Sequence, residues 1–311
     1  MDTSVKVLSV NISDAKGTAK HPVDFIELNS TGVKGDAHSG MWHRQVSLLG
    51  VESIEKFNAA NNLEIKYGDF AENITTKGFC LYECIPGDRL VGSGVELEVT
   101  QIGKLCHADG CAIFSQVGSC IMPREGIFAR VLKTGRLKAG DELELIPRTY
   151  KVKVVTLSDR ASRGDYEDRS GPEVVRLVNQ FFNDIGWRHS VNSTIIPDDA
   201  ATLTSTVVEA KNNGYDLLIT TGGTGIGPRD VAPDVVRPLL DKEIPGIMEM
   251  IRMKYGADKP NALISRSIAG VMGSMFVYTL PGSVKAVGEY MQEIIKIQKH
   301  LFLMLMGIDS H

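Results

Sequence analysis

Apolar and polar positions follow two different patterns along the chain, and the change between them divides it into two halves. In the second half, short apolar runs typical of buried strands alternate with stretches in which apolar residues recur every three or four positions. This order predicts an α/β unit with a mostly parallel sheet and helices on both faces. The predicted strands are 152–157, 193–196, 217–220 and 275–280.

The predicted helices of the second half carry their apolar residues on one side. One helix starts at Pro172, a second lies around 203–210, and the last follows Gly282. The apolar side of the first helix is formed by Val174, Leu177, Val178, Phe181 and Phe182, and that of the last by Val284, Val287, Met291, Ile294 and Leu301.

The first half has a different pattern. Short alternating runs at 95–99 and 142–145 are separated by turn signals such as Pro86-Gly87-Asp88, and a helical period is found only near 51–60. This pattern predicts a compact β-barrel. The fold class expected for the chain is therefore α/β plus β, with domains at 1–148 and 149–311.

Length and composition limit the classes of function. A chain of 311 residues holds about two domains, and its net charge of −4 argues against a nucleic-acid surface held by bulk charge. No apolar run reaches the roughly 18 residues that cross a bilayer, and the first residues lack the apolar core of a signal peptide. We therefore expect a cytoplasmic protein with no membrane or nucleic-acid partner.

The five cysteines, Cys80, Cys84, Cys106, Cys111 and Cys120, all lie in the first half. Their odd number and the length of the chain argue against a disulfide framework, and their spacing does not match a zinc site. Residue type alone leaves buried thiols and functional thiols as open alternatives.

The most informative motif is the glycine loop Gly222-Gly223-Thr224-Gly225. It lies between a predicted strand and a predicted helix start, where backbone N–H groups form a natural anion site. Its spacing matches neither a P-loop nor the dinucleotide fingerprint. Asp230 follows closely, which favours phosphate chemistry with a metal over a tight turn without a ligand.

Polar and glycine residues also follow the other predicted strands of the second half. Because the carboxyl ends of parallel strands share one edge of a sheet, these clusters are expected to converge there. Each cluster alone would also be compatible with a helix cap or a turn. The clusters are Ser158, Asp159 and Arg160 with Asp168, Ser170 and Gly171; Asp198 and Asp199; the loop 222–225 with Arg229 and Asp230; and Pro281, Gly282 and Ser283.

The second half resembles the MoaB/Mog family, which includes molybdopterin adenylyltransferases. The resemblance covers essentially all of 150–311, and the motifs that carry it are Leu157-Ser158-Asp159-Arg160-Ala161-Ser162, Ile196-Pro197-Asp198-Asp199, Thr220-Thr221-Gly222-Gly223-Thr224-Gly225, Pro228-Arg229-Asp230-Val231, Leu263-Ile264-Ser265-Arg266 and Leu280-Pro281-Gly282-Ser283. It implies transfer of AMP from ATP to the terminal phosphate of molybdopterin, with release of pyrophosphate. It also implies a homo-oligomer, usually a trimer, that works with other molybdenum cofactor assembly proteins.

The resemblance also implies roles for individual residues. Asp198 and Asp230 are the acidic pair expected to hold Mg²⁺ and to align the reacting groups. The backbone of 222–225, of Ser170-Gly171 and of Gly282-Ser283 is expected to bind phosphate or pterin. Arg229 and Arg266 are expected to contact anionic groups, with solvated surface arginines as the alternative.

One motif departs from the family pattern. The chain reads Arg229-Asp230-Val231-Ala232-Pro233-Asp234 where the family pattern has threonine and glutamate at positions 232 and 234. Ala232 lacks a hydroxyl and Asp234 has a shorter side chain. The alternative that this departure favours is a scaffold or carrier that binds molybdopterin without adenylating it.

The first half resembles a MOSC domain. The segments that show this resemblance are Gly35-Asp36-Ala37-His38, Arg44-Gln45-Val46-Ser47-Leu48-Leu49, residues 68–76 and residues 126–132. The resemblance implies a barrel that binds the molybdenum cofactor or modifies it with sulfur through a cysteine.

The candidate cysteines are Cys106 and Cys120, with Cys111 as a possible partner of either. Lys104 and His107 are expected to activate Cys106, and Arg124 to activate Cys120. His38 and His43 either line an anion pocket or are ordinary surface or core histidines. A chain that joins these two domains by a short linker is expected to serve molybdenum or tungsten cofactor assembly and to pass a labile pterin between its domains.

Overall fold

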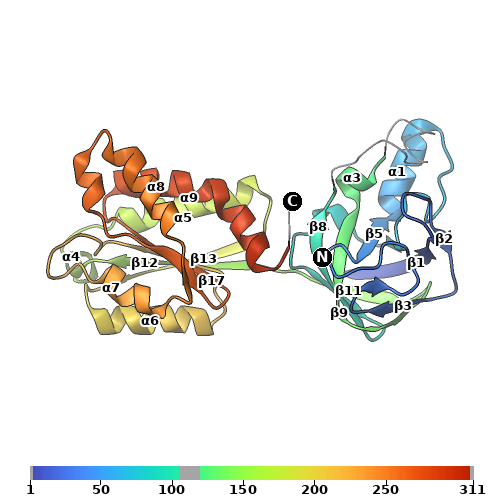
Figure 1. Cartoon of the computed structure of the whole chain (residues 1–311), viewed down its shortest axis with the longest axis horizontal. Coiled ribbons are helices and arrows are strands. Elements are labelled where there is room, and N and C mark those ends of the chain that lie inside the picture. The colour runs from blue at the N-terminus through green and yellow to red at the C-terminus, as the bar shows by residue number, and fades with distance from the viewer. Residues whose placement is uncertain (1–2, 105–119, 309–311) are drawn as a thin grey trace. The chain divides into compact units, whose positions relative to one another are not determined.

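The computed structural model describes residues 3–104 and 120–308, and it divides into two compact units. The first unit is Met1–Arg148 together with a short segment from Gly307, and the second is Thr149–Met306. Figure 1 shows the elements of both units.

The first unit is a β-barrel of seven strands. The strands follow the order β11-β7-β8-β9-β5-β6-β1, and the antiparallel pairing of β1 with β11 closes the barrel. The parallel neighbours are β5 and β6. The barrel strands are β1 (Ser4–Ile12), β5 (Val46–Gly50), β6 (Ile74–Lys77), β7 (Arg89–Gly92), β8 (Val95–Ile102), β9 (Ile127–Lys133) and β11 (Glu142–Ile146).

Short elements complete this unit. The strand β2 (His21–Pro22) pairs with the end of β1, and a separate sheet joins β10 (Gly135–Leu137), β3 (Ile26–Asn29) and β4 (Gly32–Val33). The helix α1 (Val51–Asn61) follows β5 directly, and α3 (Met122–Glu125) and the 3-10 turn η1 (Leu81–Glu83) are short.

Buried and partly exposed side chains alternate along the barrel strands, so one side of each strand forms the interior of the barrel. In β8, for example, Val95, Leu97 and Val99 are buried while Glu96 and Glu98 are only partly buried, so every second side chain faces the interior. A second apolar cluster lies under α1 and α3 and consists of Leu49, Ile54, Phe57, Phe70, Met122 and Phe128.

The second unit is built on a six-stranded sheet with the order β13-β12-β14-β17-β16-β15. The four strands β13 (His189–Ile196), β12 (Tyr150–Leu157), β14 (Leu217–Thr221) and β17 (Met275–Leu280) are parallel. The strand β16 (Ala269–Met272) runs antiparallel to both of its neighbours, β17 and the short edge strand β15 (Lys242–Glu243).

Helices cover both faces of this sheet. In Figure 1, α5, α8 and α9 lie on one face and α6 and α7 on the other. The helices are α4 (Asp159–Ser162), α5 (Ser170–Asp184), α6 (Ala200–Asn212), α7 (Ala232–Val236), α8 (Pro245–Gly256) and α9 (Val284–Leu305), with 3-10 turns η2 (Arg237–Leu239) and η3 (Pro260–Ile264).

The predicted fold class is confirmed, a barrel followed by an α/β unit with a mostly parallel sheet. On the predicted apolar side of α5, Val174, Val178, Phe181 and Phe182 are buried and Leu177 is half-buried. On that of α9, Val287, Met291 and Ile294 are buried, whereas Val284, the first residue after the cap Ser283, is 43% exposed. Within the described residues, no helix is long and apolar enough to span a membrane.

Candidate functional site

The predicted polar clusters of the second unit meet at the carboxyl ends of its parallel strands. The backbone ties neighbouring strand ends together: Ser158 N donates to Ile196 O at 3.0 Å, and Gly222 N donates to Leu280 O at 3.0 Å. Thr221 Oγ1 also donates to Pro281 O at 2.9 Å. The edge where ligands bind in open α/β sheets therefore carries all the predicted clusters.

Asp159 and Asp198 hold the ends of β12 and β13 together. Asp159 N donates to Asp198 Oδ2 at 3.0 Å, and Asp198 N donates to Asp159 Oδ1 at 3.1 Å. The second oxygen of Asp159 accepts from Arg229 Nη1 at 2.7 Å. Asp159 therefore acts as a positioning residue for Asp198 and for Arg229, a connection that local sequence does not reveal.

The glycine loop begins with two residues in the left-handed region. Gly222 has φ 100° and Gly223 has φ 65°, and a Cβ at Gly222 would lie 2.4 Å from Leu157 O. Gly223 O and Thr224 O accept from Ala232 N and Arg266 N, which fixes the course of the loop. Within the described chain, the N–H groups of Gly223, Thr224 and Gly225 have no acceptor, so they are available to an anion.

Asp230 folds back over this loop. Its Oδ2 accepts from Gly227 N at 2.8 Å, and a Cβ at Gly225 would lie 2.6 Å from the same oxygen. Only glycine at 225 allows the carboxylate to approach so closely. The loop therefore places backbone donors and a carboxylate side by side, which is the arrangement expected for a phosphate with a bound cation.

Arg266 differs from its expected role. Its Nε donates to Gly225 O at 2.7 Å, its Nη1 donates to both oxygens of Asp234 at 2.7 and 2.8 Å, and its Nη2 donates to Asp230 O. Each guanidinium nitrogen thus binds the protein itself, so the structure gives Arg266 the role of a loop organiser. Asp234, which sequence analysis noted only as a departure, supplies the carboxylate.

The start of α5 also differs from expectation. Asp168 Oδ1 accepts from Ser170 N at 2.9 Å, Gly171 N at 3.1 Å and Ser170 Oγ at 3.0 Å, and its Oδ2 accepts from Thr156 Oγ1 at 2.6 Å. The donors expected to bind phosphate already have a carboxylate acceptor within the protein. Asp168 reaches them because it lies two residues before the helix, where an aspartate side chain folds back onto the first turn.

Among the remaining predicted residues, two serines cap helices, Gly282 lies against the glycine loop, and Arg160 is exposed. Ser158 and Ser283 cap α4 and α9 by accepting from Ala161 N at 3.1 Å and Ala286 N at 3.2 Å. A Cβ at Gly282 would lie 3.3 Å from Gly222 Cα, so the loops after β14 and β17 are in close contact. Arg160 is exposed, with its guanidinium 5.0 Å from the Tyr166 ring.

The acidic pair fits a hard cation of the Mg²⁺ type. In the described part of the second unit, Asp198 and Asp230 each use Oδ2 as an acceptor and keep Oδ1 without a partner. Proteins usually hold Mg²⁺ through one or two carboxylates and the phosphates of the substrate, so two carboxylates are enough ligands for this ion.

The structure describes only one of the three candidate cysteines of the first unit, Cys120. Cys106, Cys111 and His107 lie outside the described residues. Cys120 is half-buried and packs against the apolar cluster that contains Met122 and Phe128. Arg124, expected to activate it, is exposed on α3.

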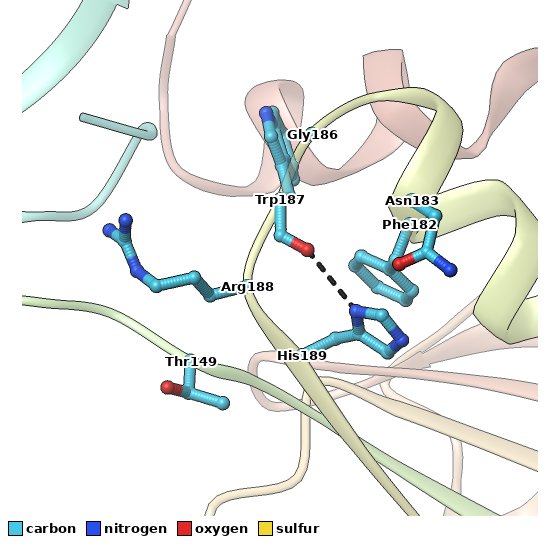
Figure 2. Close-up of a pocket in the computed structure, with 7 residues that line it drawn as sticks. All are labelled: Thr149, Phe182, Asn183, Gly186, Trp187, Arg188 and His189. Atoms are coloured by element: carbon cyan, nitrogen blue, oxygen red, sulfur yellow. Dashed lines mark hydrogen bonds between the residues drawn. The ribbon is translucent and has the colours of Figure 1, made fainter. Parts of the chain in front are cut away.

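A hollow of about 550 Å³ in the second unit lies at the amino ends of the parallel strands, where β12 and β13 begin. Figure 2 shows His189 Nδ1 facing Trp187 O, 3.2 Å away, and His189 Nε2 also lies 2.9 Å from Asn179 Oδ1. Both ring nitrogens are thus engaged by the protein. The hollow is separate from the predicted site, because it lies where β12 and β13 start and the predicted residues follow the ends of these strands.

Comparisons with known proteins relate each half of the chain to a known family. Residues 153–300 match the family described as "Probable molybdopterin binding domain", and residues 35–144 match the MOSC domain. The chain is 33% identical over 163 residues to a protein of Pyrococcus furiosus named "Molybdopterin adenylyltransferase", which covers 50% of this chain and 92% of the relative.

Two further relatives match the same half. Gephyrin of Dictyostelium discoideum is 38% identical over 155 residues, which span 48% of this chain but only 21% of gephyrin. The crystal structure of a molybdopterin biosynthesis protein from Mycobacterium abscessus is 34% identical, covers 51% of this chain and 97% of its own, and has a TM-score of 0.46. The chain belongs to the MoaB/Mog family of molybdopterin-binding proteins through its second unit, and it carries a MOSC domain in its first.

Proposed function

We propose that the second unit transfers AMP from ATP to the terminal phosphate of molybdopterin. An oxygen of the molybdopterin phosphate attacks the α-phosphorus of ATP, the bond from that phosphorus to the bridging oxygen breaks, and pyrophosphate leaves. The relative from Pyrococcus furiosus supports this assignment, because it is named for this activity and is matched over 92% of its length. Molybdenum cofactor assembly is the process that such a transfer would serve.

The observation that carries the proposal is the loop 222–230. Its backbone offers three N–H donors that have no acceptor among the residues the structure describes, and Asp230 lies against the same turn. N–H donors bind and orient phosphate oxygens, and a fixed carboxylate suits a divalent cation. The reaction moves a highly charged group with little covalent help, so positioning and charge stabilisation are what the site has to supply.

Asp198 and Asp230 are the residues that would hold Mg²⁺. When bound, the ion would neutralise charge on the phosphates as the α-phosphorus changes partners. Asp159 keeps Asp198 in place through the reciprocal backbone contacts. Arg229 pairs with Asp159 and is 71% exposed along its side chain, so it can exchange this partner for an anionic group of the substrate.

Ala232 bears on the alternative of a non-catalytic scaffold. Its side chain is fully buried in the apolar cluster behind the loop, and its N–H donates to Gly223 O. The missing hydroxyl would therefore face packed apolar side chains. The departure at position 232 therefore alters the packing behind the loop. The N–H donors of the loop stay in place, which favours the enzyme over the scaffold.

The test is AMP transfer by the purified full chain with molybdopterin, ATP and Mg²⁺, followed as pyrophosphate release. We expect Asp198→Asn and Asp230→Asn each to lower the rate at least about 100-fold, the order of effect of removing a charge-stabilising group. Chelation of the divalent ion should abolish transfer.

Asp199→Asn is the matched control. Asp199 adjoins Asp198, but it caps α6 through Thr202 N at 2.8 Å, and hydrogen bonds from Thr202 lower the pKa of its carboxyl. Asparagine caps helices as well as aspartate does, so this variant should fold and transfer AMP normally. Tight molybdopterin binding without any transfer in the unmodified chain would contradict the enzyme proposal and support a scaffold.

A further inference from the structure

The two edges of the sheet in the second unit differ in length and in charge. One edge is β15, which has only two residues, Lys242 and Glu243, both of them charged and exposed. The other edge is β13, which has eight residues and contains no aspartate, glutamate, lysine or arginine. Short or charged edge strands resist pairing with another chain, whereas long and uncharged edge strands favour it. Of the two edges, only β15 has this protection.

The outer side of β13 carries a row of unpaired backbone groups. Its pairing with β12 runs from His189 to Ile196 without a register shift, so no bulge interrupts the strand. Arg188 O accepts from Tyr150 N at 2.9 Å. Ile196 O accepts from Ser158 N at 3.0 Å.

These two bonds show which backbone groups of β13 face outwards. In a parallel ladder the N–H and C=O groups of one residue point to the same neighbouring strand, and this direction alternates along the strand. Both acceptors belong to even-numbered residues, so the even-numbered residues of β13 face β12. The outward N–H and C=O groups have no hydrogen-bond partner within the described chain, and they belong to His189, Val191, Ser193 and Ile195.

The side chains of β13 are complementary to a second copy of the same strand. Antiparallel pairing about a two-fold axis at Ser193 places Ser193 opposite itself and Val191 opposite position 195 of the second copy. Ile195 is 42% exposed and Val191 is half-buried, so this register covers one apolar side chain with another. Because none of these residues is an acid, a lysine or an arginine, no like charges meet.

The same register also pairs the outward backbone groups. Opposed residues that face each other in an antiparallel ladder exchange two N–H···O=C bonds, so the central pair and the two flanking pairs would form about six bonds. Pro197 follows the strand and has no N–H, so the ladder ends before it. Backbone and side chains therefore favour the same register.

We infer that the outer edge of β13 is an interaction surface for a second copy of this chain, which joins two sheets into one continuous sheet across a two-fold axis. A contact of this kind uses the same surface on both copies and closes at two, so it leaves no long edge free. A trimer built through another surface would be doubled by the same pairing. The inference is independent of the proposed transfer of AMP.

The test is the molar mass of the full chain at micromolar concentration, measured by light scattering after size-exclusion chromatography. Ser193→Lys places two lysines opposite each other on the axis, where like charges destabilise a strand pair. We expect its mass to be half that of the unmodified chain, and the same for Ser193→Glu. A mixture of the two variants places lysine opposite glutamate and should recover the full mass. Ser193 is exposed, so both variants should keep the urea midpoint of the unmodified chain.

Ser190→Lys is the matched control, because it adds the same charge to another exposed serine of β13. In the inferred register, position 190 lies opposite position 196 of the second copy, so the added charges do not meet and the mass should not change. An unmodified chain with the mass of one copy would overturn the inference, as would a full mass in Ser193→Lys or a halved mass in Ser190→Lys. Failure of the mixture to recover the full mass would also overturn it, because the contact would then not have its axis at Ser193.

Discussion

Arg266 shows how a residue can decide the shape of a site without touching a ligand. It joins η3 to the glycine loop through Gly225 O and Asp230 O, and its pair with Asp234 keeps the guanidinium plane fixed. The planar fork of arginine allows these contacts at once, and lysine offers only one nitrogen. The orientation of Asp230 therefore depends on Arg266.

Arg266→Lys tests this positioning role. We expect AMP transfer to fall roughly ten- to hundredfold, mainly in kcat, because Asp230 and the loop would be held less firmly while the direct ligands remain. The free energy of unfolding should change by only about 1 kcal/mol, since the Asp234 side of the pair is exposed. Steady-state kinetics with urea unfolding of the same preparation measure both.

Arg237→Lys provides the control for the loss of a forked contact. Arg237 makes the same kind of pair with Glu243, at 3.1 and 3.3 Å, away from the glycine loop. Its transfer rate should equal that of the unmodified chain. Normal kcat in Arg266→Lys would show that the loop keeps its shape unaided.

At the residue scale, sequence analysis locates what is local. The glycine loop and the polar residues that follow each strand, Asp198 and Asp230 among them, could be placed at one edge of the sheet because strand ends and glycine positions can be read from neighbouring residues; their role in holding Mg²⁺ stays a prediction. The protein partners of the site residues could not be predicted. Arg266 contacts residues 32 to 41 positions away, and Asp159 contacts Asp198 across two strands. Such contacts depend on tertiary packing, which gives Arg266 and Asp168 the protein partners described above.

At the scale of elements, helix α8 and the antiparallel edge were missed. The start of α8 at Pro245-Gly246 has the pattern of a turn, and its exposed Met250 and Met253 blur the apolar stripe formed by Ile247 and Ile251. The edge strand β15 has only two residues, too few for any period to be seen. The central strands were predictable because their apolar runs are continuous.

Helices α8 and α9 are joined by an ion network that makes stability depend on pH. Glu293 on α9 is buried and accepts from Lys254 of α8 and Lys296 of α9, each at 2.7 Å. The hydrogen bonds of Lys254 and Lys296 lower the pKa of Glu293 from 4.5 to about 2. Because the pKa is lowered on folding, the stabilisation is complete above about pH 4.5 and is lost as the pH falls towards 2.

Glu293→Gln should remove this dependence. At pH 7 we expect the second unit to lose roughly 1–2 kcal/mol, a value reduced because both lysines are about half exposed. The difference from the unmodified chain should narrow below pH 4 and nearly vanish near pH 2. Urea unfolding followed by Trp187 fluorescence in a Trp42→Phe background reports on this unit alone.

Glu167→Gln is the control for an exposed pair, since Glu167 and Arg169 are both largely exposed. It should change stability by only a few tenths of a kcal/mol at any pH. A constant difference between Glu293→Gln and the unmodified chain from pH 7 to pH 2 would show that the loss arises from packing, and the ion network would then not be the cause.

At the scale of the whole molecule, the two units have separate cores, and the chain passes from the first to the second over a short segment. Strand β11 ends at Ile146 and β12 begins at Tyr150, so residues 147–149 are the only chain between them in that direction. A short tether raises the effective concentration of one unit near the other to about the millimolar range. A ligand released by the first unit therefore meets the second unit of the same chain before that of another chain at micromolar protein concentration.

This tether gives a last prediction, which rests on the proposed transfer and on molybdopterin as a ligand of the first unit. The two units, produced separately and mixed at the concentration of the unmodified chain, should transfer AMP at least about threefold more slowly at limiting molybdopterin, because hand-over must then occur between separate molecules. At saturating molybdopterin the two rates should be equal, since transfer no longer depends on the first unit. Equal rates at both concentrations would show that the pterin reaches the second unit from solution, and the two domains would then share a chain without sharing a ligand.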